Sequence, residues 1–327
     1  MRRRAAALVL ALALTLWLPF STGAQQAKTN RIGILLYSSA AAYSTRYPLL
    51  RQALADVGWI EGRNLVVEQR SAEGQNDRLP ELAADLVRSG ASVILTENAP
   101  ATRAAMQATS TIPIVMMFVG DPIRYGFINS LARPGGNVTG TSFLAGEMVL
   151  KNLELLKEAA PRTARVAFFV NPTNQGAAPI LADLQTAAPG LGIRIIQVDV
   201  ATPDDFERAF ASIIREKADS ILAGPEQLIF SQRRRVAAFA EKHGLPSAYA
   251  SVRFMDAGGL MAFAPDITDF PRLLARYVDK LLKGAKAADL PVEQPSKFEL
   301  VINAKTAKAI GLKLPQSLLL RADRIIE

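Results

Sequence analysis

The chain has 327 residues, of which 38 are Lys or Arg, 30 are Asp or Glu, one is His and none is Cys. This length exceeds what one hydrophobic core usually serves, so we expect two domains or one large α/β domain. An apolar content of 50% with only 21% charged residues excludes a disordered chain. The lack of cysteine excludes disulfide scaffolds, zinc fingers and thiol catalysis, and a single histidine argues against a Ser-His-Asp triad. We therefore expect no metal and no cofactor.

The first 24 residues predict an export signal. Arg2, Arg3 and Arg4 precede an apolar run at 5–18, and small residues follow at 21–24. This order is typical of a secretory signal peptide, here cleaved after Ala24. The apolar run is too short to span about 30 Å of hydrocarbon, which argues against a membrane anchor. Because no cysteine can carry a lipid, we expect a periplasmic protein that is not a lipoprotein.

Short β-rich runs alternate with amphipathic helices from residue 31 onward. In the first half, strands are expected at 32–37, 64–69, 92–96, 112–119 and 138–143. Helices are expected between them at 48–57, 76–89, 100–109 and 123–132. Each connection is a helix rather than a tight hairpin, so the pattern predicts parallel pairing.

The second half repeats this plan. Strands are expected at 165–170, 194–200, 220–223, 247–250, 260–264 and 297–303. Helices are expected near 149–160, from 202, from 268 to 283 and at 304–310. The helix after residue 202 opens with Thr202-Pro203-Asp204-Asp205, which has the spacing of a capping box.

About five βα units precede residue 144 and about five follow it, which predicts an α/β protein with two doubly wound parallel-sheet lobes facing a central cleft. We assign 28–143 and 266–327 to the first lobe and 144–265 to the second. As an alternative, the final segment crosses back to the second lobe. Ligands of such sheets bind at the carboxyl ends of the strands, and here those ends can face a shared cleft.

Signs of catalysis or of nucleic-acid binding are missing from the sequence. No glycine-rich phosphate loop is present. His243 ends a predicted helix, where a cation suits the helix dipole. The run 233–235 of three arginines is interpreted as a solvated helix face, so we expect no nucleic-acid partner.

The candidate ligand-binding residues are those that follow each predicted strand. In the first lobe and at the hinge they are Ser38, Ser39, Glu97, Asn98, Ala99, Phe118, Gly120, Asp121, Ser142 and Phe143. In the second lobe they are Asn171, Thr173, Gln175, Glu226, Tyr249, Ser251 and Phe263.

These side chains suit a small zwitterionic or carboxylated ligand. Hydroxyls and backbone N–H groups at helix starts suit a carboxylate. Glu97, Asp121 or Glu226 could hold an ammonium group, and Phe118, Tyr249 or Phe263 an apolar side chain. Glu97 is the strongest candidate, because a structural function would rarely require a carboxylate directly after an apolar strand.

Several of these residues have a structural alternative. Asp121, before Pro122, could cap the next helix. Phe118 and Phe143 could be core residues, and Ser38 and Ser39 ordinary loop residues. Glu226 could face solvent.

Three stretches of the sequence carry a family resemblance. They are 112–122 with 130–140 (Ser-Leu-Ala-Arg-Pro-Gly-Gly-Asn-Val-Thr-Gly), then 153–158 (Leu-Glu-Leu-Leu-Lys-Glu), then 257–303. Together they resemble the ABC-transporter substrate-binding proteins with a type I periplasmic-binding fold, in the branch of tryptophan- and tyrosine-type binders. The likeness covers essentially all of the chain after the signal peptide.

The resemblance implies a monomeric periplasmic receptor of an ABC importer. It would close on a small amino-acid-like or carboxylated ligand and deliver it to an inner-membrane permease with its cytoplasmic ATPase. Thr96-Glu97-Asn98-Ala99-Pro100 and Phe263-Ala264-Pro265 depart from the family pattern at cleft positions, so the resemblance does not extend to the ligand's identity. The alternatives are a ligand-sensing module for a membrane receptor and an enzyme on the same scaffold, which could use only Glu97 with Asp121.

Overall fold

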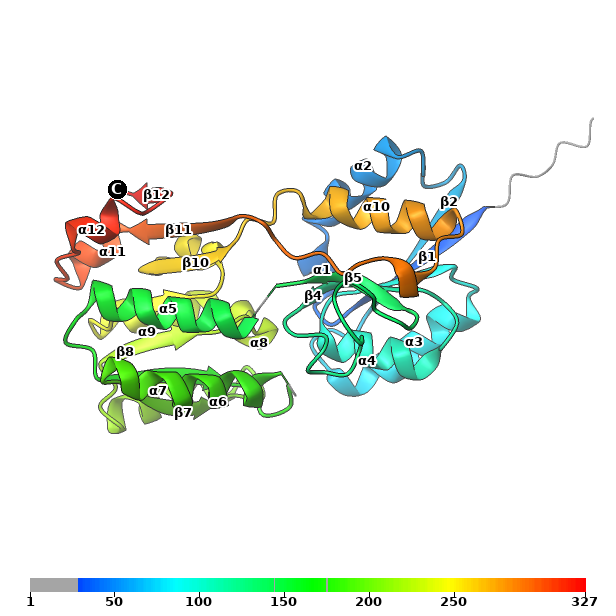
Figure 1. Ribbon diagram of the computed structural model, residues 1–327. Coiled ribbons are helices and arrows are strands. Elements are labelled where there is room, and N and C mark those ends of the chain that lie inside the picture. Colours follow the sequence, from blue (N-terminus) through cyan, green and yellow to red (C-terminus); the bar gives the residue numbers. More distant parts are fainter. Residues whose placement is uncertain (1–28, 144, 175) are drawn as a thin grey trace, which may run out of the picture.

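The computed structural model describes residues 29–143, 145–174 and 176–327, so the predicted signal peptide lies outside the described residues. Two α/β lobes lie side by side and are joined by extended segments (Figure 1). Each lobe has one mainly parallel sheet with helices on both faces. This confirms the predicted fold class.

The first lobe is built on a five-stranded parallel sheet, whose three central strands are apolar runs buried on both faces. In spatial order its strands are β2 (Leu65–Ser71), β1 (Asn30–Leu36), β3 (Val93–Thr96), β4 (Ile114–Val119) and β5 (Val138–Ser142). Its helices are α1 (Ala40–Tyr43), α2 (Tyr47–Asp56), α3 (Leu79–Arg88), α4 (Ala99–Ala108) and α10 (Phe270–Leu282), with short 3₁₀ helices η1 (Asn76–Arg78) and η4 (Ala287–Asp289). Two apolar clusters cover the two faces of this sheet.

The second lobe has a seven-stranded sheet. In spatial order its strands are β12 (Arg324–Ile326), β11 (Phe298–Asn303), β10 (Met261–Pro265), β9 (Ser247–Tyr249), β8 (Ser220–Ala223), β6 (Arg165–Val170) and β7 (Arg194–Asp199). Its helices are α5 (Ala145–Ala159), α6 (Ala177–Ala187), α7 (Asp205–Arg215), α8 (Gln227–Ser231), α9 (Arg233–Lys242), α11 (Ala304–Ala309) and α12 (Gln316–Leu319), with η2 (Ala188–Leu191) and η3 (Val252–Ala257). Two apolar clusters again cover the faces of the sheet.

The chain passes between the lobes three times: from β5 to α5, from β10 to α10 and from η4 to β11 (Figure 1). α10 belongs to the first lobe, where Trp59 Nε1 donates a hydrogen bond to Asp279 Oδ1 at 3.0 Å. Residues 298–327 lie in the second lobe, which is the alternative that the sequence left open. Because β11 returns from the first lobe, it enters the sheet in the reverse direction and pairs antiparallel with β10.

One predicted helix is wrong. Residues 123–126 form turns instead, and 127–132 have bends without regular secondary structure. Gly126 adopts φ 70°, a left-handed conformation that ends any helical run. Phe127 and Ile128 are nevertheless buried against the first sheet, so the apolar pattern that suggested a helix comes from tertiary packing.

The capping box predicted at 202–205 is half formed. Asp205 begins α7, and its Oδ2 accepts hydrogen bonds from the backbone N–H groups of Ala201 and Thr202. The Thr202 hydroxyl donates to the same oxygen at 3.0 Å instead of capping the helix. These bonds to the charged form lower the pKa of Asp205.

Candidate functional site

A cavity of about 220 Å³ lies between the lobes and is lined by residues of both. The loops after β1, β3 and β4 form one wall, and those after β6, β8, β9 and β10 form the other. Four charged side chains line it: Arg46 and Glu97 from the first lobe, and Glu226 and Arg253 from the second. The site therefore has two formal positive and two formal negative charges.

Glu97 directly follows β3, and its side chain is only 3% exposed. Ser38, directly after Tyr37 at the end of the neighbouring strand β1, holds both of its oxygens. Its backbone N–H donates to Oε2 at 2.8 Å, and its hydroxyl donates to Oε1 at 2.7 Å. Each carboxylate oxygen has a second lone pair, so Glu97 is a fixed acceptor that can still accept a donor from a ligand.

Glu226 has a structural function as well as a place in the cavity. Its Oε2 accepts the backbone N–H of Ile229 at 3.0 Å and so caps α8, while Asn171 Nδ2 donates to Oε1 at 3.1 Å. Burial raises the pKa of Glu226, and these hydrogen bonds oppose that shift.

Replacement of this acid by its amide is expected to change the pH dependence of stability. The raised pKa means that the native state holds the proton more tightly, so Glu226 lowers stability as the pH rises above 4.5. Glu226→Gln removes this effect and keeps an oxygen for the cap. We expect the unfolding free energy of Glu226→Gln, relative to wild type in urea titrations without ligand, to increase from pH 4 to pH 8. A difference that stays constant over this range would contradict the prediction.

Tyr37 places a phenol near both acids. It lines the cavity at the end of β1, and burial together with the charges of Glu226 and Glu97 raises its pKa to about 12. The hydroxyl therefore stays protonated at neutral pH and can donate or accept a hydrogen bond.

The remaining lining combines aromatic and amide side chains with small and aliphatic residues. The aromatic residues are Tyr37, Tyr125, Phe143, Phe168, Phe169, Phe230 and Phe254, and the amides are Asn76, Asn98, Asn171, Asn174 and Gln227. Such a mixture of apolar walls and a few polar groups is typical of small-molecule sites. In the described ranges, no group of three His, Asp or Glu side chains could hold a metal.

Among the predicted residues that the structure describes, eight line this cavity. They are Glu97, Asn98, Ala99, Gly120, Phe143, Asn171, Glu226 and Ser251. All of them lie at or just beyond the carboxyl ends of strands, except Glu226 and Ser251, which begin the short helices α8 and η3 a few residues later.

Four predicted polar residues have local structural functions and do not line the main cavity. Ser38 fixes Glu97, and Ser39 caps α1 through the N–H of Ala42. The Ser142 hydroxyl donates to the Gly120 carbonyl oxygen at 3.2 Å. Thr173 donates to Asn171 Oδ1 and lines a smaller adjoining cavity.

Asp121 has a local function too, since its Oδ1 accepts the N–H of Arg124 at 3.0 Å within the turns that replace the predicted helix. It does not line the cavity. The pair that an enzyme on this scaffold would need, Glu97 with Asp121, is therefore not assembled there.

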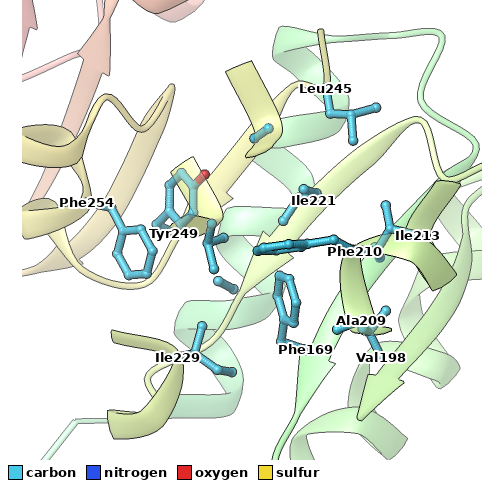
Figure 2. Packing of buried hydrophobic residues seen from close by; sticks show 14 of the residues in the cluster. Phe169, Val198, Ala209, Phe210, Ile213, Ile221, Ile229, Leu245, Tyr249 and Phe254 are labelled. Atoms are coloured by element: carbon cyan, nitrogen blue, oxygen red, sulfur yellow. The ribbon is translucent and has the colours of Figure 1, made fainter. Parts of the chain in front are cut away.

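Two predicted aromatic residues are part of the packing. Tyr249 is fully buried in the second lobe, stacked on Phe254 with ring centroids 4.1 Å apart (Figure 2). Phe263 stacks on Phe298 at 5.4 Å. Side chains along a strand point alternately to the two faces of the sheet, and both of these side chains point to a face rather than into the cleft.

Asn152 on α5 hydrogen-bonds to the backbone of β10 at Phe263, one residue beyond the point where β10 pairs with β9. Its amide donates to the Phe263 carbonyl oxygen at 2.8 Å, and its Oδ1 accepts the Phe263 N–H at 3.0 Å. We expect Asn152→Leu to lower the unfolding free energy by about 2 kcal/mol, because both backbone groups of Phe263 lose their partner. Urea unfolding measures this, with Lys151→Leu on the exposed side of α5 as the control. Equal stability of the two variants would contradict this function of Asn152.

Gln175 and the side chain of Phe118 lie outside the described residues. Sequence reasoning missed Tyr37, Arg46, Asn76, Tyr125, Phe230 and Arg253, all of which line the cavity. Tyr37 could have been found, since it ends the first predicted strand. Arg46, Asn76 and Arg253 lie several residues beyond a strand, and no local pattern brings them together.

In the described part of the chain, three contacts connect the lobes across the cleft. Arg124 pairs with Asp183 on α6 at 3.0 Å. Asn76 Nδ2 donates to Thr173 Oγ1 at 3.4 Å. The Tyr125 ring lies so close to Gly176 that only a glycine fits there. The fold and this cavity define a two-lobed small-molecule binding protein.

Comparisons with known proteins give the family. The model of the ABC transporter substrate binding protein family matches residues 31–326, and the chain belongs to this family. A tyrosine-binding protein of Clostridioides difficile (strain R20291) is 26% identical over 262 residues, which cover 80% of this chain and 75% of that protein. None of the helices in the described ranges has the length and apolar character to cross a membrane.

Two solved structures share the whole fold. A conserved domain protein of Vibrio cholerae has a TM-score of 0.85 at 27% identity, covering 91% of this chain and all of that one. An ABC domain of Streptococcus pneumoniae in complex with L-Trp has a TM-score of 0.82 at 24% identity, with the same coverage. The predicted family resemblance is confirmed.

Proposed function

We propose that this substrate-binding protein takes up a small zwitterionic, amino-acid-like ligand in the cavity between its lobes. It acts in the periplasm after export, as a monomer without catalytic activity, and delivers the ligand to the permease of an ABC importer. The observation that carries the ligand class is the lining of the cavity, where two arginines and two glutamates face the same space. This balance matches a ligand with one carboxylate and one ammonium group better than a neutral sugar.

The acidic groups suit the ammonium of such a ligand. Glu97 is held in place by Ser38, and Glu226 lines the same cavity from the other lobe. Asn76 Oδ1 is buried and has no hydrogen-bond partner within the described part of the chain. A bound ammonium group could satisfy it.

The size of the cavity and its apolar walls indicate the size of the ligand and the type of its side chain. About 220 Å³ is below the roughly 300–1,000 Å³ typical of sites for drug-sized ligands. The aromatic walls suit an apolar or aromatic side chain. The relative from Clostridioides difficile, which is named for tyrosine binding, supports the same class.

Calorimetric titration with L-tyrosine, L-tryptophan, L-leucine and glucose tests the ligand class. We expect saturable binding of at least one amino acid and none of glucose. Glu97→Gln is expected to weaken amino-acid binding by about 10-fold, because a charged hydrogen bond to the ammonium becomes a neutral one. Glu81→Gln, on the exposed face of α3, is the matched control.

The outcomes separate the parts of the proposal. Binding of an amino acid that Glu97→Gln leaves unchanged would reject the ammonium site only. Binding of glucose and of no amino acid would reject the ligand class. Loss of uptake of the labelled amino acid in cells that lack this protein tests the transport step.

A further inference from the structure

A second cavity of about 170 Å³ adjoins the main one and also lies between the lobes. Its first-lobe wall is formed by α4, the start of α3 and Tyr125, and its second-lobe wall by the loop after β6. The two cavities share part of their walls, namely Asn76, Ala99, Pro100, Tyr125, Asn174 and Gly176. A ligand held in the main cavity therefore has further space directly beside it.

Arg103 on α4 is the only charged side chain that lines the second cavity in the described part of the chain. Its guanidinium lies over the Phe127 ring, 5.0 Å from the ring centroid, and its Nη2 donates to the Tyr125 carbonyl oxygen at 3.2 Å. Both partners are neutral, so they hold the guanidinium in place without cancelling its charge. A ring contact uses the face of the guanidinium, and the bond to Tyr125 uses one of its five N–H groups, so most of these donors remain for a ligand.

The charges that line the two cavities are different. In the main cavity, two arginines and two glutamates balance one another. Among the described residues, the second cavity adds the positive charge of Arg103 and no negative charge. A guanidinium keeps its proton at any physiological pH, so this charge is permanent. A zwitterionic ligand matches the main cavity alone, whereas a ligand with one further acidic group matches both cavities.

Asn76 lies where the two cavities meet, because it lines both. Its Nδ2 donates to Thr173 Oγ1 of the other lobe at 3.4 Å, and its buried Oδ1 has no hydrogen-bond partner within the described ranges. An ammonium group that donates to this Oδ1 therefore lies at the boundary of the second cavity. A side chain on the same carbon atom can enter that cavity, where Leu79, Pro80 and Pro100 offer apolar contacts for its stem.

We propose that the second cavity is a subsite for an acidic group at the end of the ligand's side chain, and that Arg103 binds this group. The ligand is then an amino acid with an acidic side chain, which carries one net negative charge. A guanidinium matches the planar geometry of a carboxylate and can donate two parallel hydrogen bonds to it. This inference rests on the proposed function and adds one chemical group to its ligand.

Matched acids and amides test the inference by calorimetric titration. The first pair is para-carboxy-L-phenylalanine and para-carbamoyl-L-phenylalanine, and the second is L-α-aminoadipate and its side-chain amide. The members of each pair have nearly the same size and differ in one negative charge. We expect wild type to bind the acid of at least one pair about 10-fold or more tighter than its amide, because hydrogen bonds between opposite charges are the stronger ones. In Arg103→Gln this preference should fall to below about 2-fold.

Two further variants control for charge and for folding. Arg272→Gln removes an exposed arginine of α10 in the same lobe and is expected to keep the full preference. Arg103→Lys keeps the positive charge but loses the planar fork, so an intermediate preference is expected. Circular dichroism shows whether Arg103→Gln is folded, and Arg103→Lys replaces it if it is not.

Each outcome decides for or against the Arg103 subsite. A preference for an acid that survives in folded Arg103→Gln would overturn the subsite, and so would a wild type that prefers neither acid to its amide. Binding of L-tyrosine in either case would leave the proposed function intact. Arg103-dependent binding of an acid without binding of L-tyrosine would support the subsite and exclude a neutral aromatic amino acid as the ligand. If no amino acid of either kind binds, the subsite and the proposed function both fail.

Discussion

Gly176→Ala is expected to weaken ligand binding by about 5- to 150-fold, equivalent to 1–3 kcal/mol of overpacking in the closed cleft. A methyl carbon at this position would lie 2.9 Å from Tyr125 Cζ and closer still to the Tyr125 hydroxyl oxygen, across the cleft. The Tyr125 ring packs edge-on against Phe127 at 5.7 Å, which limits how far it can move away. The variant relieves the clash most easily by opening the lobes, and an open cleft loses contacts to the ligand.

The stability of Gly176→Ala should change by less than about 1 kcal/mol, because Gly176 has ordinary helical dihedral angles at the start of α6. Calorimetry measures affinity, and small-angle scattering with ligand measures closure. Tyr125→Phe removes the hydroxyl but keeps the ring carbon, so Gly176→Ala should cost less affinity in the Tyr125→Phe background than in wild type. Gly190→Ala in the same lobe, where an added methyl meets nothing, is the control. Strictly additive effects of the two substitutions would show that the clash is not the cause.

Gly140→Ala is expected to lower the unfolding free energy by about 4 kcal/mol or more, the largest stability effect that the structure predicts. Gly140 adopts φ 124° in β5, a region that is strained for any other residue. An added methyl carbon would lie 2.6 Å from the Met116 nitrogen and closer still to its carbonyl oxygen. These are backbone atoms of the paired strand β4, so no side-chain rotation can relieve the contact.

Urea or thermal unfolding tests this prediction. Gly136→Ala, four residues earlier, is the matched control, because its added methyl group would meet no atom within 4 Å and its backbone has no positive φ. We expect the control to change the unfolding free energy by less than about 1 kcal/mol. A similar small change in Gly140→Ala would show that β4 and β5 separate at little cost.

The strands and most helices could be predicted from the sequence because their signals are local. The expected strand at 165–170 and the expected helix at 304–310 agree with the structure to within one residue. Local signals failed at 123–132, where the apolar residues are buried by packing against the sheet. The direction of β11 also lies beyond local patterns, since it depends on the path of the chain through the other lobe.

Part of the site could be predicted by the same reasoning. The carboxyl ends of parallel strands meet at one edge, so Glu97, Asn98 and Asn171 could be placed from their positions after strands. Whether a polar side chain at a strand end binds a ligand or bonds to nearby backbone could not be predicted in this way. Asp121 and Ser142 bond to neighbouring backbone, and Glu97 faces the cavity with Ser38 behind it.

By itself, the sequence determined the α/β class, the two-lobed plan, the family and one cluster of cavity residues, because periodicity and strand ends are properties of short segments. Only the tertiary structure decided that Arg46 and Arg253 line the same cavity, that Tyr249 belongs to the core and that Gly176 lies against Tyr125. Those relations join residues from different lobes or different faces of a sheet. They depend on packing over tens to hundreds of residues, to which no local pattern of residue types corresponds.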